Sequence, residues 1–150
     1  MTASATIEKL HDPSDTDRAR IAILVGQLSS HPPDVKTVAV NVDELLADPR
    51  SVLFVARSEA GEIVGMASGA IFTKTVGHEA RLNDVVVDES ARGQGLGRRL
   101  TQMVVDWAWA HGADALQFTS RPSRVAANAL YQSMGFKPKE TNVYDVSRPE

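Results

Sequence analysis

The chain has 150 residues, a formal charge of −3 at pH 7 and no cysteine. Without cysteine it can form no disulfide, no thiolate metal site and no cysteine nucleophile. The slightly acidic balance disfavours a nucleic acid partner, because binding a phosphate backbone draws on clustered lysine and arginine. The four histidines are dispersed along the sequence, so we expect no metal site.

Length and composition predict one globular domain over residues 1–150. Hydrophobic residues make up 43% of the chain and charged residues 23%, which is ordinary for a globular fold. Residues 1–5 are small and polar and lack the apolar core of a secretory signal, and no run approaches the roughly 20 apolar residues of a membrane span. We therefore expect a cytoplasmic protein with no membrane partner.

The N-terminal part of the chain predicts one strand and two helices. Residues 6–10 predict a first strand, and apolar residues at helical spacing predict an amphipathic helix over residues 15–29. Residues 29–42 contain two consecutive prolines and predict a long irregular segment. A short helix is expected to follow at residues 43–47, ending before the next proline.

The central part predicts a hairpin, a third strand and a helix. Residues 52–57 and 63–72 are rich in β-branched or apolar side chains and are separated by a turn sequence. Residues 81–87 predict a further strand. Helical spacing then runs over residues 96–111, and Gly112 supplies a C-terminal stop.

The C-terminal part predicts a strand, a helix and a closing β segment. Residues 113–120 predict a short strand, and residues 122–135 predict the last helix. Residues 136–146 predict one or two closing strands, with Pro138 indicating an edge or a bulge. Strands and helices in this order predict a mixed α/β sheet.

The most informative stretch spans residues 85–100, which comprise a valine-rich strand end, a turn and a glycine-dense helix start. Glycines let the main chain approach a bulky anion and adopt conformations that a Cβ disfavours. A helix start leaves four N–H groups without intrahelical partners and carries about half a positive charge. Arg92, Arg98 and Arg99 add positive charge. The stretch therefore predicts a site for a phosphate-bearing ligand.

Spacing rejects two familiar phosphate loops. The dinucleotide fingerprint needs G-x-G-x-x-G, and counted from Gly93 its third glycine falls at Arg98. The nucleotide triphosphate loop needs Gly-Lys-Ser/Thr, which occurs nowhere in the chain. This spacing and the chain's length argue against a dinucleotide oxidoreductase. The pattern that does occur is Arg92-x-x-Gly95-x-Gly97.

This pattern, following a valine-rich strand, resembles the acyl-CoA-binding segment of the GNAT acetyltransferase superfamily. A second signature of that family, a helix ending in L-Y-x-x-x-G-F, is matched by Leu130, Tyr131, Gly135 and Phe136. The resemblance implies an α/β fold with a mixed, mostly antiparallel central sheet flanked by helices, whose fourth and fifth strands splay apart. It also implies acetyl-CoA as the cofactor, with its pantetheine arm in the gap between those strands.

The resemblance implies cofactor contacts at both signatures. The main chain of the valine run would bind the pantetheine arm if the fourth strand has the family's usual irregularity, and the glycine turn would bind the pyrophosphate. The spacing i, i+4 and i+7 places Arg124, Asn128 and Tyr131 on one stripe of the last helix. The implied cofactor-binding residues are Val85, Val86, Val87, Arg92, Gly93, Gln94, Gly95, Leu96, Gly97, Arg98, Arg124 and Asn128. Arg124 and Asn128 could instead be surface residues of the helix.

The resemblance also implies a general acid, because Tyr131 matches the family's tyrosine near the cofactor sulphur, where it protonates the departing thiolate. The alternative for Tyr131 is a half-buried tyrosine with its hydroxyl in solvent.

The general base is less clearly marked. Family members that acetylate peptide lysine often carry a glutamate early in the fourth strand, where this chain has Arg81. We favour Asp84 as the base and keep Glu79 as a second candidate. Strict alternation would place Asp84 on the same face as Leu82 and Val86. A structural carboxylate paired with Arg81 or another cation is an equal alternative for Asp84.

These residues predict an acetyl-CoA-dependent N-acetyltransferase that moves the acetyl group directly to a primary amine of a small molecule or peptide. The alternative is a non-catalytic acyl-CoA-binding or sensing domain. We expect the acceptor to be selected by residues 29–48 and by a loop at residues 73–79, because these segments match the family least. Trp109 lies off the core stripe of its helix and is consistent with a homodimer contact.

Overall fold

The computed structural model of the protein describes residues 5–150 and divides the chain into two compact units, Met1–Thr119 and Ser120–Glu150. Residues 1–4, on which the expectation about a secretory signal partly rests, lie outside the described residues. No helix within residues 5–150 has both the length and the apolar character needed to cross a membrane. One domain over the whole chain stays a prediction.

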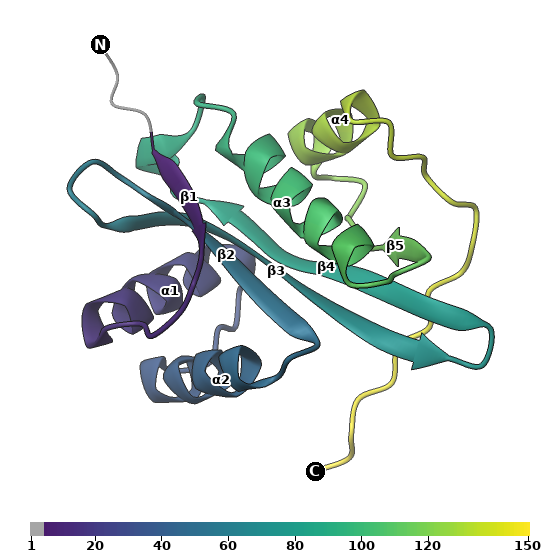
Figure 1. Cartoon of the computed structure of the whole chain (residues 1–150), viewed down its shortest axis with the longest axis horizontal. Coiled ribbons are helices and arrows are strands. Elements are labelled where there is room, and N and C mark those ends of the chain that lie inside the picture. Colours follow the sequence, from purple (N-terminus) through teal and green to yellow (C-terminus); the bar gives the residue numbers. More distant parts are fainter. Residues whose placement is uncertain (1–4) are drawn as a thin grey trace. The chain divides into compact units, whose positions relative to one another are not determined.

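The first unit is built on a five-stranded sheet with the strand order β1-β2-β3-β4-β5 (Figure 1). Neighbouring strands from β1 to β4 are antiparallel, whereas β5 runs parallel to β4. The strands are β1 (Thr6–Lys9), β2 (Ser51–Arg57), β3 (Ile63–Lys74), β4 (Gly77–Val87) and β5 (Ala115–Gln117). The predicted mixed, mostly antiparallel sheet is confirmed. Short turns join β2 to β3 and β3 to β4, two helices lie between β1 and β2, and a helix connects the parallel pair β4 and β5.

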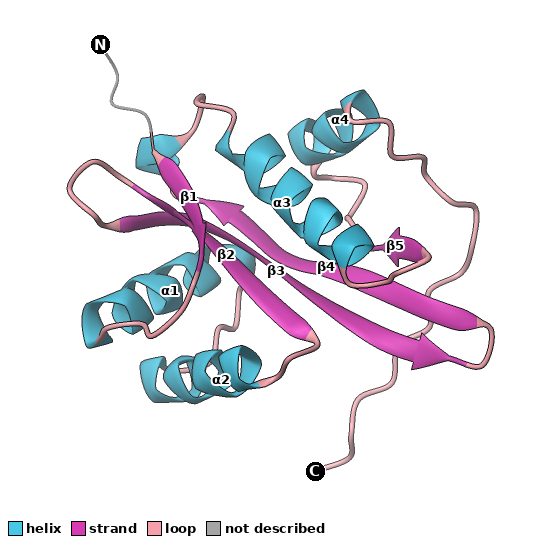
Figure 2. Ribbon diagram, in the orientation of Figure 1, coloured by secondary structure: helices cyan, strands magenta, loops and turns pink. Residues whose placement is uncertain are grey.

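Helices cover both faces of this sheet within the first unit (Figure 2). α1 (Asp15–Leu28) and α2 (Val35–Ala47) pack on one face, and α3 (Leu96–Ala110) packs on the other. A short 3-10 helix, η1 (Glu89–Ala91), connects β4 to the turn before α3. In the second unit the chain forms α4 (Val125–Ser133). Each sheet face is thus closed by an apolar helix surface, as the mixed α/β pattern predicts.

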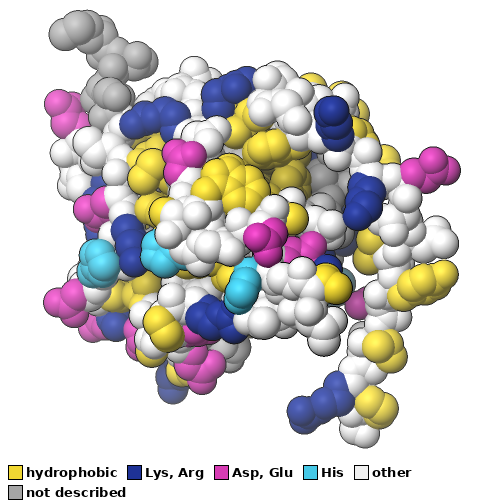
Figure 3. Space-filling view, turned by 45° about the vertical axis from the view of Figure 1, so that its right-hand side comes forward, with side chains coloured by type: hydrophobic (Ala, Val, Ile, Leu, Met, Phe, Trp, Pro, Cys, Tyr) yellow, Lys and Arg dark blue, Asp and Glu magenta, His cyan; other side chains and the backbone are white. Residues whose placement is uncertain are grey.

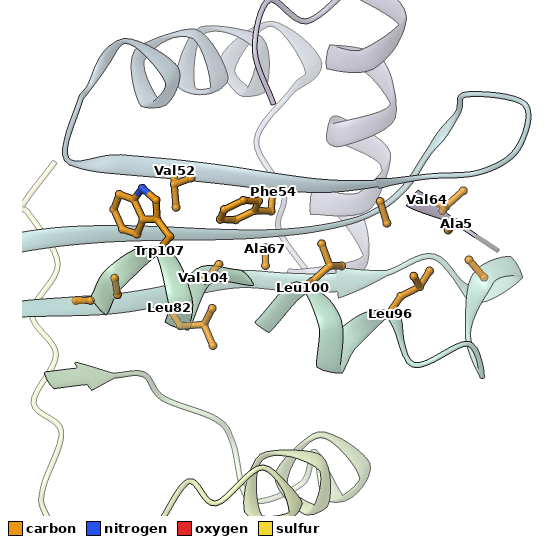
Figure 4. Close-up of a cluster of buried hydrophobic side chains, with 14 of the residues drawn as sticks. Ala5, Val52, Phe54, Val64, Ala67, Leu82, Leu96, Leu100, Val104 and Trp107 are labelled. Atoms are coloured by element: carbon orange, nitrogen blue, oxygen red, sulfur yellow. The ribbon is translucent and has the colours of Figure 1, made fainter. Parts of the chain in front are cut away.

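The core between the sheet and α3 depends on large side chains that meet across the layer. Figure 4 shows Val52 and Phe54 of β2 on the same side of the sheet as Leu100, Val104 and Trp107 of α3, and all five are buried. Full burial of such a side chain contributes about 1.5–3 kcal/mol. This packing fixes where α3 begins relative to the end of β4.

Two glycines of β3 allow α3 to approach the sheet closely. A Cβ added at Gly65 would lie 3.2 Å from Cδ1 of Leu100, and one added at Gly69 would lie 2.6 Å from Cγ1 of Val104. Real Cβ atoms essentially never show a contact as short as 2.6 Å. The helix therefore occupies space that a side chain on β3 would need.

The opposite core corrects the prediction of a long irregular segment at residues 29–42. α2 begins at Val35, because the side chain of Asp34 accepts a hydrogen bond from the Thr37 N–H at 2.7 Å and caps the helix. Val38 and Val42, four residues apart, are buried in the core under α1 and α2. The prediction gave too much weight to the two prolines, which precede Asp34 and so do not interrupt the helix, and tertiary packing overrides the low helix propensity of the valine and threonine residues that follow.

Two β predictions are also wrong in detail. The expected loop at residues 73–79 is the tip of a regular hairpin, since β3 extends to Lys74, β4 starts at Gly77 and these two residues pair. The expected closing strands at residues 136–146 are absent from the described part of the second unit. Its apolar side chains Val143 and Tyr144 are exposed, so no burial offsets the entropy of ordering a strand there.

A cluster of ion pairs joins β1, β2 and the first turn of α1. The Arg57 guanidinium on β2 donates to both carboxylate oxygens of Asp17, at 2.8 and 3.0 Å, and also pairs with Glu8. Asp17 additionally completes a capping box with Ser14 at the start of α1. The bond from Arg57 is the main reason why the pKa of Asp17 is lowered.

We expect Gly69→Ala to lower the free energy of unfolding by about 1–3 kcal/mol, because its Cβ would overlap Val104 in a packed core. Gly26→Ala is the matched control, since a Cβ at this position on α1 meets nothing within 4 Å. That control should stabilise the protein by about 0.5–1 kcal/mol through helix propensity. Urea unfolding measures both, and equal effects of the two substitutions would contradict the proposed close packing.

The lowered pKa of Asp17 predicts an acid-dependent contribution to stability. A carboxyl group whose folded pKa lies below its unfolded value of about 3.9 stabilises the fold above that pH and loses this effect as the pH falls. Arg57→Met removes the main cause of the shift, so its destabilisation relative to wild type should shrink between pH 6 and pH 3. Arg50→Met, which removes a bond to Thr73, is the control. A pH-independent difference for Arg57→Met would refute this assignment.

Candidate functional site

The centre of the candidate site is a β-bulge in β4. Between two consecutive paired positions, β3 contains the single residue Ala67, whereas β4 contains two residues, Asp84 and Val85. Asp84 takes up the excess in a left-handed conformation with φ +52°. Few residues other than glycine adopt this region, although aspartate does so more readily than most. The family's irregularity in the fourth strand was a condition of the sequence prediction, and the structure contains such an irregularity.

The bulge exchanges the two faces of β4. Before it, Leu82 packs in the core under α3; after it, Val86 packs in the core under α1 and α2. Val85 and Val87 now pack against the α3 core instead. The prediction that Asp84 shares a face with both Leu82 and Val86 is therefore wrong, because one extra residue inverts a period of two.

The edge of β4 that faces away from β3 is paired only over part of its length. β5 pairs with three residues of β4, the last of which is Arg81. From Leu82 to Val87 no strand within residues 5–119 pairs with this edge. The predicted splaying of the fourth and fifth strands thus leaves a stretch of main chain without a ladder partner in that unit.

Ladder geometry decides which main-chain groups face the open edge. The Asp88 N–H donates to the Val64 carbonyl of β3 at 2.8 Å. Because the groups of successive residues alternate between the two edges of a strand, Val87 and Val85 present theirs to the open edge and Val86 presents its own to β3. Of the valine run, two residues thus have main-chain groups available to a ligand.

The turn after β4 has the geometry that its glycines predict. Gly93 and Gly95 have φ values of +81° and +72°, and Gly95 is the N-cap of α3. Among the described residues no side chain caps the helix start. Gly97 lies in the first helical turn, Gln94 is exposed, and the side chain of Leu96 is buried in the core. The main chain at this helix start therefore has the features of an anion site.

The arginines around the turn have different surroundings. Arg92 donates from Nε to the Val87 carbonyl at 3.3 Å, which ties the turn to the open edge of β4. Arg99 donates to the carbonyl of Ala5 at 3.3 Å and so contacts the N-terminal end of the described chain. Arg98 is exposed. All three add positive charge near the helix start, where the dipole already favours an anion.

Asp88 connects the turn to α1. Its carboxylate accepts hydrogen bonds from the Gln27 side chain at 2.9 Å and from the Ser90 main chain at 3.2 Å, and the Ser90 hydroxyl also donates to it. The Ser90 hydroxyl, followed by Gln27, holds the pKa of Asp88 below its ordinary value. The negative charge of Asp88 thereby anchors the entrance to the glycine turn to Gln27 of α1.

The two candidate bases differ in what they bind. Asp84 accepts a hydrogen bond from the Ser68 hydroxyl at 3.0 Å and forms no ion pair within residues 5–150. Glu79 pairs with Lys74 at 3.4 Å. The alternative prediction, an ion pair between Asp84 and Arg81, is therefore wrong. Asp84 is an exposed carboxylate, whereas Glu79 is already paired.

In the second unit the predicted residues cluster at α4. Tyr131 is 7% exposed and stacks on Phe136 at a centroid distance of 6.2 Å, and burial raises its pKa. Arg124 is the N-cap residue rather than a member of the first turn. Asn128 donates from Nδ2 to the Arg121 carbonyl at 2.9 Å, so part of its amide closes the turn before the helix.

Sequence reasoning missed two side chains of the site, Ser68 and Gln27. Ser68 lies 16 residues before Asp84, and Gln27 lies 61 residues before Asp88. Neither residue belongs to a local motif, and both contacts depend on the pairing of distant segments. Only the place of Ser68 in an otherwise small and apolar stretch of sequence could have suggested that its hydroxyl, which the structure buries, has a partner.

Comparison with known proteins relates this arrangement to one family. The model of the acetyltransferase (GNAT) family matches residues 20–136. The chain is 26% identical over 129 residues to mycothiol acetyltransferase of Renibacterium salmoninarum, covering 83% of this chain and 38% of that protein. It is 42% identical over 71 residues to the ribosomal protein bS18 alanine N-acetyltransferase of Escherichia coli K12, covering 47% of each. The chain thus spans less than half the length of these relatives.

Solved structures show the same fold. Glucosamine-6-phosphate N-acetyltransferase from Arabidopsis thaliana superposes with a TM-score of 0.80 at 22% identity, covering 95% of this chain and 98% of that one. An aminoglycoside N-acetyltransferase, AAC(6')-Iy, crystallised with CoA, gives a TM-score of 0.80 at 19% identity, covering 99% and 98%. At these identities the likeness concerns the fold.

We expect Gly95→Ala to lower the free energy of unfolding by about 1–2 kcal/mol, because a Cβ in the left-handed region clashes with the following carbonyl oxygen. Space is not the cause, since an added Cβ meets nothing within 4 Å. Gly95→Asn should cost clearly less, because asparagine tolerates this backbone and can cap a helix. Denaturant unfolding of both variants provides the measurement. Equal losses would show that the left-handed backbone is not the cause.

Proposed function

The chain belongs to the acetyltransferase (GNAT) family, and from this membership we propose that it is an acetyl-CoA-dependent N-acetyltransferase. It would transfer the acetyl group directly to a primary amine of a small molecule or peptide. Relatives with this fold include enzymes named for mycothiol, for a ribosomal protein alanine and for an aminoglycoside. The diversity of these substrates supports an amine acceptor. Which amine is acetylated depends on the residues of this chain's own site.

One observation carries the proposal: the bulge at Asp84 and Val85 is followed by an open strand edge that leads into the glycine turn. Coenzyme A combines an amide-containing pantetheine arm with a pyrophosphate. The arm can hydrogen-bond to the main-chain groups of Val85 and to the Val87 N–H as an added strand would, and at the Val87 carbonyl it would compete with Arg92. The pyrophosphate suits the uncapped start of α3 at Gly95.

The chemistry requires a neutral amine, donors for the developing oxyanion and a proton for the leaving group. In our proposal Asp84 takes a proton from the acceptor ammonium, and the amine nitrogen then attacks the thioester carbonyl. A main-chain N–H at the bulge stabilises the oxyanion. The C–S bond breaks, and Tyr131 donates a proton to the coenzyme A thiolate, a role that rests on the family signature. The attacking nitrogen loses its second proton, which returns to the Tyr131 oxygen through solvent. No acyl-enzyme is formed.

The remaining cofactor assignments rest on the same resemblance. Arg92, Gly93, Gln94, Leu96, Gly97 and Arg98 would contribute main-chain groups or charge to the pyrophosphate site, and Arg124 and Asn128 would contact the cofactor from α4. For Leu96 only main-chain groups are in question, since its side chain is buried, whereas Val86 has a buried side chain and main-chain groups that face β3. A homodimer through Trp109, which is 49% exposed, stays a prediction.

Release of free thiol from acetyl-CoA across a panel of amines tests the proposal. We expect Asp84→Asn and Tyr131→Phe each to lower kcat by about 10²–10⁴-fold, the usual contribution of a general acid or base. Glu79→Gln is the matched control, because that carboxylate is paired with Lys74, and it should change kcat little.

Two outcomes would contradict this mechanism. If neither Asp84→Asn nor Tyr131→Phe slows transfer to any amine, the assigned acid and base are wrong. If acetyl-CoA binds, as measured by calorimetry, but no amine in the panel is acetylated, the chain is a sensing domain of the kind considered in the sequence analysis.

A further inference from the structure

One face of the β3–β4 hairpin places an unpaired arginine beside the candidate base. Ala80 and Leu82 of β4 point into the core under α3, so Arg81 between them points to the opposite face. The same rule applies to β3, where an added Cβ at Gly69 would point toward Val104 of α3. Ser68, next to Gly69, therefore lies on the face that Arg81 shares.

The carboxylate of Asp84 lies on this face as well, because it accepts its hydrogen bond from Ser68. Arg81 pairs with Ala70, which is two residues from Ser68 along β3. Two residues of strand span about 7 Å. The Arg81 and Asp84 positions are thus neighbours on one face, separated by a distance that a small molecule can bridge.

Arg81 is the cation on this face that lacks a partner. Lys74 of β3 lies on the same face and pairs with Glu79 at 3.4 Å. Arg81 is exposed, and within residues 5–150 its guanidinium makes neither a hydrogen bond nor an ion pair. On the face of the molecule that Figure 3 shows, acidic and basic side chains are interspersed rather than gathered by sign.

We propose that the acetyl acceptor is an amine that also carries an anionic group, a carboxylate or a phosphate, and that Arg81 binds this anion while Asp84 takes the proton of the amine. This inference rests on the proposed N-acetyltransferase function and names its substrate class.

The charges argue for an acceptor of this kind. An amine acceptor arrives as an ammonium ion, which Asp84 attracts and Arg81 repels. A second negative group on the acceptor converts the repulsion into a charge-assisted hydrogen bond, and the planar guanidinium can bind a carboxylate or a phosphate with two parallel bonds. A polycationic acceptor would place a further positive charge near Arg81. Arg81 is thereby a specificity-determining residue.

Matched acceptors test the proposal in the thiol-release assay. L-alanine is compared with L-alaninamide, and glucosamine 6-phosphate with glucosamine, while spermidine represents a polycation. We expect the anionic member of at least one pair to have a kcat/KM at least about 10-fold higher than its neutral partner, the effect of one charge-assisted hydrogen bond. The alanine pair reports on a carboxylate and the glucosamine pair on a phosphate.

Arg81→Met should raise KM for the anionic acceptor by about 10-fold or more and leave kcat within a few-fold, and it should leave KM for the acceptor without an anionic group unchanged or lower it, because the repulsion of the ammonium is lost. Arg81→Lys should restore part of the preference, because it keeps the charge but loses the two-bond geometry. Arg50→Met is the control, since Arg50 is bonded to Thr73. Circular dichroism and unfolding of each variant confirm that the fold is kept.

Equal use of neutral and anionic amines by the wild type would overturn the inference, and so would a preference for spermidine. A loss in Arg81→Met that is the same for both members of a pair would also overturn it. These results leave acetyl transfer intact and so differ from failure of the proposed function, in which no amine is acetylated at all although acetyl-CoA binds.

Discussion

The structure of the first unit depends on one excess residue in β4. Side chains on a strand alternate with a period of two, so a single extra residue exchanges the faces of everything that follows. This is why Leu82 and Val86 pack in different cores and why the two valines that flank Val86 pack under α3. The left-handed backbone of Asp84 absorbs the irregularity, and the Ser68 hydroxyl bonds to its carboxylate. The same irregularity accompanies the open strand edge that a ligand can use.

Close packing converts this local feature into a site. The absence of side chains at Gly65 and Gly69 lets α3 lie directly on β3, and this fixes the start of α3 near the end of β4. The left-handed glycines then join the two elements in a short turn. A hydrogen bond from Gln27 to Asp88 ties the turn to α1, so helices on both faces of the sheet hold the turn in place.

Charge is divided between structural and available groups. Arg57 and Asp17 join α1 to β2, and Lys74 neutralises Glu79 on the hairpin. Asp84 and Arg81 have no ion-pair partner among residues 5–150, although both are ionisable and lie on one face of the sheet. Charged groups that form no ion pair within the fold are available to bind an acceptor. For this reason we assign catalysis to Asp84 and acceptor recognition to Arg81.

The sequence by itself determined the features that depend on neighbouring residues. The glycine turn and the helix start at Gly95 follow from local backbone preferences, and the sheet architecture follows from the family signatures together with the strand pattern. Tertiary structure decided what depends on distant pairing. The bulge at Asp84 needs the register against β3, Ser68 meets Asp84 only across that register, and α2 is held by the burial of Val38 despite its low helix propensity. Periodicity cannot reveal these features, because they arise from contacts between segments far apart in the chain.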